Sequence, residues 1–182
     1  MFSQRSGFHL FTLGRVDVFV SLWYLILMAL IIFDPFGGGA STGPAIATGI
    51  LYAAAVTLSL LVHEFGHALV SKFYKLGPSV LLHAFGGLCM HEPAETDGED
   101  ALILVAGPGA GFLLGGAAIL LMQTVSLTGA AVTFVWGVAF VSILWNAVNL
   151  FLPIYPLDGG KLFHLLLRRF MAEGKAQQLA LR

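Results

Sequence analysis

A His-Glu-x-x-His motif occupies positions 63–67, inside an otherwise apolar run of the chain. On an α-helix, side chains four residues apart lie on one face, so His63 and His67 can direct two imidazoles at one metal ion. Glu64 lies beside them, and in this motif the carboxylate is the base that takes a proton from water. The pattern therefore predicts metal-dependent hydrolysis, with two histidine ligands and Glu64 as the catalytic base.

The motif lies where ionisable residues are rare. No charged residue occurs between Pro44 and Val62, so the motif ends a segment that is long enough to enter a bilayer. Ionisable side chains there are costly and usually functional. The alternative is a chance match on a buried helix, which would leave two imidazoles and a carboxylate without partners in hydrocarbon.

A third ligand is needed, because catalytic zinc sites use three protein ligands and leave the fourth position for water. We expect it to be Asp158, which follows the last apolar run on the same predicted side of the membrane. Gly159 and Gly160 come directly after it and leave the backbone free to bend around a site. The alternative is that Asp158 only caps the final helix. One Zn²⁺ per chain is the expected cofactor.

The composition is that of an integral membrane protein. Of the 182 residues 58% are hydrophobic and 10% are charged, and the mean hydropathy is +0.88; soluble domains have about 25% charged residues. The net charge of -1 gives no indication of a nucleic-acid partner. The single cysteine, Cys89, excludes an internal disulfide. Its irregular spacing from His83 and His91 favours ordinary loop roles over a second metal site.

Four apolar stretches predict transmembrane spans, at residues 18–33, 44–72, 101–125 and 130–151. The first reaches the ~20 residues needed only when it is extended back through Leu13. Ser79 to Met90 holds β-branched and aromatic residues interrupted by Gly86-Gly87, which predicts a strand or re-entrant hairpin. An amphipathic, basic helix is expected at 161–172. The expected fold is an all-α membrane protein: a polytopic bundle of about four transmembrane helices with a small β-hairpin or strand element at the cytoplasmic side, forming a single domain over 1–182.

Lysine and arginine fall on one side of this four-span arrangement, whereas the turns at 34–43 and 126–130 contain neither. Both termini are therefore expected to be cytoplasmic. A prokaryotic inner membrane is the simplest location for so compact a chain. Arg168 and Arg169 are expected to meet anionic lipid headgroups, and the glycine-rich helix faces would permit oligomers.

The motifs together resemble the site-2 protease family of intramembrane zinc metallopeptidases. The resemblance rests on His63-Glu64-Phe65-Gly66-His67 in a membrane helix and on the later run Pro153-x-x-Pro156-Leu157-Asp158-Gly159-Gly160. Gly86-Gly87 is similar to the family's glycine pair in the hairpin after the motif helix, and Ala106-Gly107-Pro108 to the opening of its next helix. The resemblance implies zinc held by His63, His67 and Asp158, Glu64 as general base, and a transmembrane protein as substrate.

Two positions depart from the family pattern. The family usually has Asn eight residues before the ligand Asp, where this chain has Leu150, with Asn149 one residue earlier. It also often has Asn three residues after the Pro of Ala-Gly-Pro, where this chain has Gly111. Asn146 and Asn149, together with Gly86 and Gly87, are the candidates for holding the substrate. Interhelical hydrogen bonding is an equal alternative for the two asparagines.

Two other functions stay open at this stage. The altered asparagine positions would fit a catalytically inactive relative that binds membrane helices as a scaffold. A metal-dependent membrane oxygenase would also place histidines at helix ends, but a di-iron site needs more ligands than six dispersed histidines offer. Any gate controlling access would lie in the first span, in loops or in a regulatory membrane partner.

Overall fold

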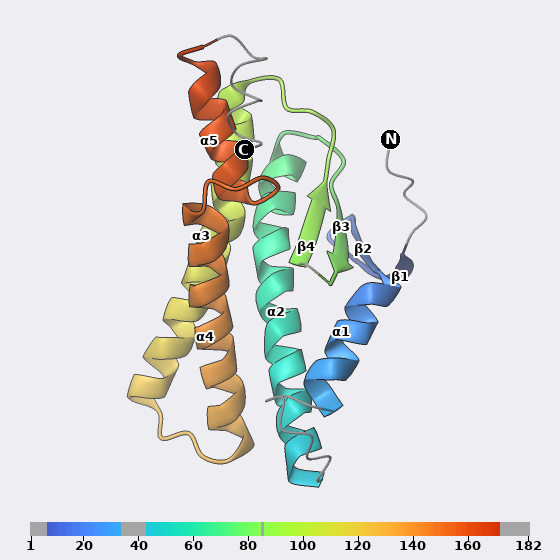
Figure 1. Ribbon diagram of the computed structural model, residues 1–182, viewed down its shortest axis with the longest axis vertical. Coiled ribbons are helices and arrows are strands. Elements are labelled where there is room, and N and C mark those ends of the chain that lie inside the picture. The colour runs from blue at the N-terminus through green and yellow to red at the C-terminus, as the bar shows by residue number, and fades with distance from the viewer. Residues whose placement is uncertain (1–6, 34–42, 85, 172–182) are drawn as a thin grey trace.

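Three long helices form the body of the molecule in the computed structural model, which describes residues 7–33, 43–84 and 86–171 (Figure 1). They are α2 (Gly43–Phe73), α3 (Asp97–Thr124) and α4 (Ala130–Phe151), and all three are long and apolar enough to cross a membrane. At 1.5 Å per residue, 22 residues give about 33 Å, which matches the hydrocarbon core of a bilayer. Large apolar side chains point outward along them, as on Leu113, which is 77% exposed. The chain is therefore a membrane protein.

The predicted spans at 44–72, 101–125 and 130–151 agree with these helices to within four residues at each end. The earlier start of α3 has a local cause. The Thr96 hydroxyl accepts a hydrogen bond from the Glu99 backbone N–H, and the Glu99 carboxylate accepts one from the Thr96 backbone N–H. This reciprocal pair is a capping box, and it starts the helix at Asp97.

The first predicted span is wrong in its bounds. Residues 18–20 belong to strand β2 (Val16–Val20), and helix α1 (Leu22–Phe33) has only 12 residues. Such a helix is about 18 Å long, well short of the ~30 Å hydrocarbon core. Within the described ranges, the structure thus has three helices of spanning length instead of four.

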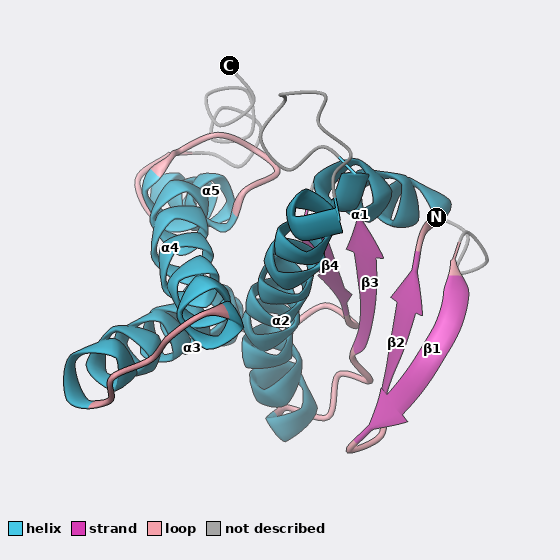
Figure 2. Cartoon of the chain, turned by 90° about the horizontal axis from the view of Figure 1, so that it is seen from below, coloured by secondary structure: helices cyan, strands magenta, loops and turns pink. Residues whose placement is uncertain are grey.

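A four-stranded sheet lies on one side of α2, with α3 and α4 on the other (Figure 2). The hairpin expected at Ser79 to Met90 is confirmed as β3 (Ser79–His83) and β4 (Gly86–Met90), which pair antiparallel. The β1 strand (Phe8–Leu13) pairs antiparallel with β2, and β2 pairs parallel with β3. The strand order is β1-β2-β3-β4, so β4 forms one edge of the sheet.

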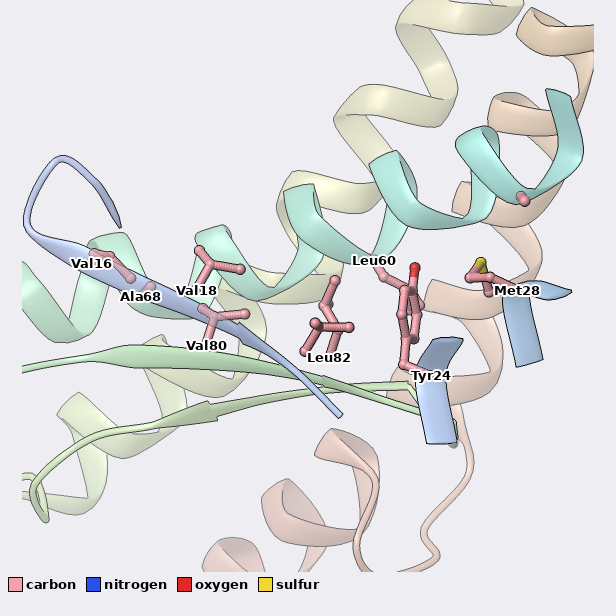
Figure 3. Packing of buried hydrophobic residues seen from close by; sticks show 10 residues of the cluster. Val16, Val18, Tyr24, Met28, Leu60, Ala68, Val80 and Leu82 are labelled. Atoms are coloured by element: carbon pink, nitrogen blue, oxygen red, sulfur yellow. The ribbon is translucent and has the colours of Figure 1, made fainter. Parts of the chain in front are cut away.

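The inner face of the sheet packs on α2 and α1 (Figure 3). Alternate residues of β2 are buried, as period-two side-chain alternation requires. The shared core comprises Val16, Val18, Val20, Tyr24, Met28, Ala53, Leu60, Ala68, Val80 and Leu82. This packing fixes the hairpin beside the helical turn that carries the His-Glu-x-x-His motif.

Small residues allow the three long helices to approach closely. A Cβ on Gly66 would lie 2.3 Å from the Ala106 carbonyl oxygen, so α2 and α3 meet backbone to backbone at the motif. Ser142 of α4 donates a hydrogen bond to Ser59 of α2 at 2.9 Å. These contacts follow the preference of membrane helices for small residues and polar pairs at their interfaces.

The last helix, α5 (Asp158–Arg168), lies beside the start of α3 (Figure 1). It begins three residues before the predicted 161–172 helix and ends earlier, and residue 172 lies outside the described residues. Arg168 contacts Asp97 of α3 at 3.5 Å. Gly159 packs so closely on the Leu150 carbonyl that a Cβ would lie 2.2 Å from its oxygen. The fold thereby brings Asp158, the first residue of α5, back to α2.

Candidate metal centre

His63 and His67 lie one helical turn apart on the face of α2 that points into the bundle. Their Nε2 atoms are 3.0 Å apart, and both side chains are buried. The Oδ2 atom of Asp158 lies 3.2 Å from the His63 Nε2 and 3.1 Å from the His67 Nε2. The structure therefore brings together the three residues that the sequence singled out as ligands.

The donor set fits a tetrahedral zinc ion. Two imidazole nitrogens and a carboxylate oxygen form a triangle with sides of 3.0–3.2 Å. With bonds of about 2.0–2.1 Å, tetrahedral ligands lie about 3.3 Å apart. Three protein donors also leave a fourth position for water or substrate, as in catalytic zinc sites. Across the described part of the chain no second group of three such side chains converges, so His83, Cys89 and His91 do not form one.

The outer nitrogens of both imidazoles are held by hydrogen-bond acceptors. The His63 Nδ1 lies 2.6 Å from the Asn146 Oδ1, and the His67 Nδ1 lies 2.6 Å from the Ile103 carbonyl oxygen. Each Nδ1 must donate, so in the neutral ring each Nε2 carries a lone pair. The lone pairs of the two Nε2 atoms and the Asp158 Oδ2 therefore face one another at about 3 Å. These electron-rich atoms repel, and a cation between them would remove the repulsion.

Asn149 contacts the same donor atoms. Its Nδ2 donates to the Asp158 Oδ2 at 2.6 Å and lies 3.2 Å from the His63 Nε2, while its Oδ1 accepts from the Asp158 backbone N–H at 3.4 Å. The Asn displaced by one residue in the sequence thus still reaches the site. Leu150 occupies the position where the family usually has Asn, and its backbone carbonyl packs on Gly159.

Glu64 is 3% exposed and lies beside the three donors without joining them. Its Oε1 is 3.8 Å from the His63 Nε2. Glu64 also lines a pocket of about 530 Å³ together with both histidines, Asp158 and the β4 residues Gly87, Leu88 and Cys89. A carboxylate at the edge of the donor triangle, facing this pocket, can exchange a proton with a water held there.

Gly87 packs directly on Glu64, because a Cβ at Gly87 would lie 2.2–2.4 Å from the carboxylate side-chain atoms. Gly86 has φ +127, a backbone conformation that favours glycine, and lies against Trp145. The glycine pair therefore lets the edge strand approach the motif helix. That the glycine pair also holds substrate stays a prediction.

Replacing Gly87 by Ala is expected to lower the cleavage rate about 100-fold while zinc content stays at the wild-type level. The added methyl displaces Glu64, and misplacing a catalytic group by about 1 Å costs about that factor. Zinc would be measured by elemental analysis and cleavage with a peptide substrate. Gly116→Ala, at a glycine with nothing within 4 Å, is the matched control. Wild-type cleavage by Gly87→Ala would show that this contact does not position the base.

Several contacts at the site were not predicted from the sequence, although Gly107 belongs to the Ala-Gly-Pro motif. Ile103 acts through its backbone carbonyl, and Gly107 leaves room for the His67 ring, since a Cβ there would lie 2.1 Å from its Nε2. Trp145 and Lys161 line the pocket, and the Lys161 Nζ lies 3.9 Å from the Asp158 Oδ1. Of these residues, Lys161 could have been predicted to lie near the site, because it directly follows the Asp-Gly-Gly run.

Cys89 lines the pocket but remains a thiol. Burial, helped by the nearby Glu64 carboxylate, raises its pKa to about 12. A protonated thiol is a poor nucleophile at neutral pH, and Cys89 is not among the side chains that converge on the donor triangle. Cys89 is therefore a packing residue of β4.

Comparison with known proteins finds relatives that are named zinc metalloproteases. The chain is 26% identical over 124 residues to the zinc metalloprotease MJ0392 of Methanocaldococcus jannaschii, a match covering 68% of this chain and 36% of that protein. It is 31% identical over 171 residues to Rip3 of Mycobacterium tuberculosis, whose name also describes a zinc metalloprotease, covering 86% of this chain and 43% of Rip3. The chain thus spans less than half the length of these relatives. No family model matches it.

A solved structure shares the fold. The site-2 protease from Methanocaldococcus jannaschii superposes with a TM-score of 0.75 at 20% identity, covering 96% of this chain and 77% of that one. The shared region includes nearly all elements described above.

Proposed function

We propose that this chain is a member of the site-2 protease family, an intramembrane zinc metallopeptidase that hydrolyses a peptide bond in or near a transmembrane segment of a membrane-anchored protein. The observation that carries the proposal is the buried triangle of His63, His67 and Asp158 with Glu64 beside it, at the end of an apolar helix. Relatives that are named zinc metalloproteases support the same chemistry.

His63, His67 and Asp158 would hold the zinc. When bound, zinc supplies a Lewis acid that polarises the scissile carbonyl and lowers the pKa of water. Glu64 accepts the proton of the attacking water and passes it to the leaving amine nitrogen. The Asn149 amide holds the Asp158 carboxylate in place through its 2.6 Å hydrogen bond. Burial of all five side chains keeps these charges in a medium of low dielectric constant, where they interact strongly.

The substrate must be extended locally before it can be cut, because a transmembrane helix hides its peptide bonds within its own hydrogen-bond ladder. The β4 strand is an edge of the sheet and lines the pocket beside Glu64. An extended substrate segment would add to this edge through backbone hydrogen bonds. Gly86 and Gly87 would serve as substrate-binding residues in this way, through their backbone.

The site is placed near the cytoplasmic face of a prokaryotic inner membrane, on the side where Lys and Arg gather. Because the described residues hold three spanning helices and not four, the cytoplasmic position of both termini stays a prediction. The partners proposed are the transmembrane substrate, membrane lipid and a regulatory membrane protein. The inactive-scaffold alternative depended on the two altered asparagine positions. Because Asn146 and Asn149 both reach the site, that alternative loses its main argument.

Metal removal tests the proposal. Treatment of the purified chain with a strong chelator is expected to reduce cleavage of a model single-span substrate to background, and about one equivalent of Zn²⁺ should restore it. Mg²⁺ should not restore it, because imidazole ligands favour zinc over magnesium. Full cleavage by demonstrably metal-free protein would refute a zinc peptidase.

A further inference from the structure

A buried amide lies behind His63, on the side away from the pocket. Asn146 of α4 is 1% exposed and is not among the residues that line the pocket. Its Oδ1 accepts from the His63 Nδ1 at 2.6 Å, and its Nδ2 donates to the Ser142 carbonyl oxygen. Asn146 therefore contacts a predicted zinc ligand, and it does so from behind that ligand, outside the pocket that Glu64 lines.

Both ends of this amide have fixed partners. The Ser142 carbonyl can only accept, so it requires the NH₂ end of the amide, and the oxygen must then face His63. Turning the amide over would place two acceptors against each other at Ser142 and leave a donor facing the Nδ1–H of His63. The amide thus permits one orientation of the His63 ring and one tautomer, with the lone pair of Nε2 directed at the donor triangle.

Gly111 of α3 provides the space for this amide. A Cβ at Gly111 would lie 2.0 Å from the Asn146 Nδ2 and 2.4 Å from both its Cγ and its Oδ1. Glycine in the middle of a helix is destabilising relative to alanine, so it is favoured where another group needs the room. At Gly109 and Gly116 of the same helix, by contrast, nothing lies within 4 Å.

We propose that Asn146 is a positioning residue for His63 and that Gly111 is its required complement on the facing helix. The inference rests on the proposed zinc site and names the residues that set its affinity. The same amide could be carried by position 111 of α3 or by position 146 of α4. In an asparagine the carbonyl oxygen lies about 2.4 Å from Cβ across two bonds, and a Cβ at Gly111 would lie 2.4 Å from the present Oδ1 position. An amide carried by residue 111 could therefore reach the same Nδ1 once Asn146 is removed.

Zinc affinity tests the proposal, measured on the full chain in detergent by competition with a chelator of known affinity. Asn146→Leu keeps the volume but removes the acceptor, and it should weaken zinc binding about 10–100-fold, as loss of a partner behind a ligand does. Gly111→Ala should weaken it in the same way by displacing the amide. Ser142→Ala removes the hydroxyl bond to Ser59 but keeps the carbonyl, and Gly116→Ala fills open space, so both should bind zinc like the wild type.

Recovery of zinc affinity in a double variant distinguishes a positioning role of Asn146 from a role in packing alone. The double variant Gly111→Asn/Asn146→Gly should recover affinity to within a few-fold of the wild type, and its Co²⁺-substituted form should regain the wild-type absorption spectrum, which Asn146→Leu changes. Should Asn146→Leu fail to fold, Gly111→Ala and the double variant decide by the same measurements.

Wild-type affinity in Asn146→Leu or Gly111→Ala, or a double variant no better than the single ones, would overturn the inference while the zinc site stands. A wild-type chain without zinc would instead overturn the proposed function, and the inference with it.

Discussion

Glu64→Gln is expected to lower the rate of peptide cleavage about 10²–10⁴-fold while the protein keeps one zinc per chain. Glutamine has nearly the same shape as glutamate but cannot accept a proton, and general-base catalysis contributes about this factor. Glu64 is not one of the three donors, so zinc should stay bound. Cleavage of a single-span substrate and elemental analysis would be carried out on the same preparation.

The matched control is Glu92→Gln, which makes the same chemical change at an exposed glutamate. It should cleave like the wild type. If Glu64→Gln cleaved at the full rate with zinc bound, Glu64 would not be the base, and another pocket residue would have to take the proton.

Asp158→Ala should weaken zinc binding more than about 100-fold and abolish cleavage. Loss of a residue that only supports a ligand costs about 10–100-fold in affinity, and a direct ligand should cost more. Removal of Asp158 leaves two imidazoles, which cannot complete a catalytic zinc site. It also leaves the Asn149 amide without its 2.6 Å acceptor. Metal affinity measured by chelator competition gives the result directly.

Asp97→Ala is the control for this change. It removes an aspartate from the contact between α3 and α5, where Asp97 meets Arg168 at 3.5 Å on the surface. Exposed ion pairs contribute little to stability, so this variant should fold and bind zinc normally. Wild-type zinc affinity in Asp158→Ala would show that the third ligand lies elsewhere.

The ligand set could be predicted from sequence because its signals are local. Helical spacing alone puts His63 and His67 on one face, and Asp158 follows an apolar run that must end at the same side. The span at 130–151 matches α4 residue for residue, because a long apolar run between turns has no competing interpretation.

The N-terminal region shows where that reasoning fails. Residues 18–33 contain no charged residue, and their composition cannot separate a strand end followed by a short helix from a single span. The choice is made by pairing across the fold, since β2 joins β3 in parallel with Val18 opposite Val80. The alternation of Val16 to Val20 is typical of a strand and predicts a short strand or an interfacial segment, and the structure has the strand. Its partner lies in a distant segment, which the local pattern does not reveal.

The support behind the ligands could be predicted only in part, because the sequence singled out Asn146 and Asn149 but not their contacts with His63 and Asp158. The acceptor for His67 is a backbone carbonyl, which any residue at position 103 would provide. The one-residue displacement of Asn149 hides its contact with Asp158, and Gly111 has meaning only once Asn146 is seen opposite it. Each of these depends on how the helices are packed.

The most direct measurement is anomalous X-ray diffraction at the zinc edge from crystals of the full chain. One peak is predicted, about 2.0–2.2 Å from the His63 Nε2, the His67 Nε2 and an Asp158 carboxylate oxygen. A zinc ion bound elsewhere, or no zinc at these three side chains in protein that cleaves its substrate, would contradict the proposed site.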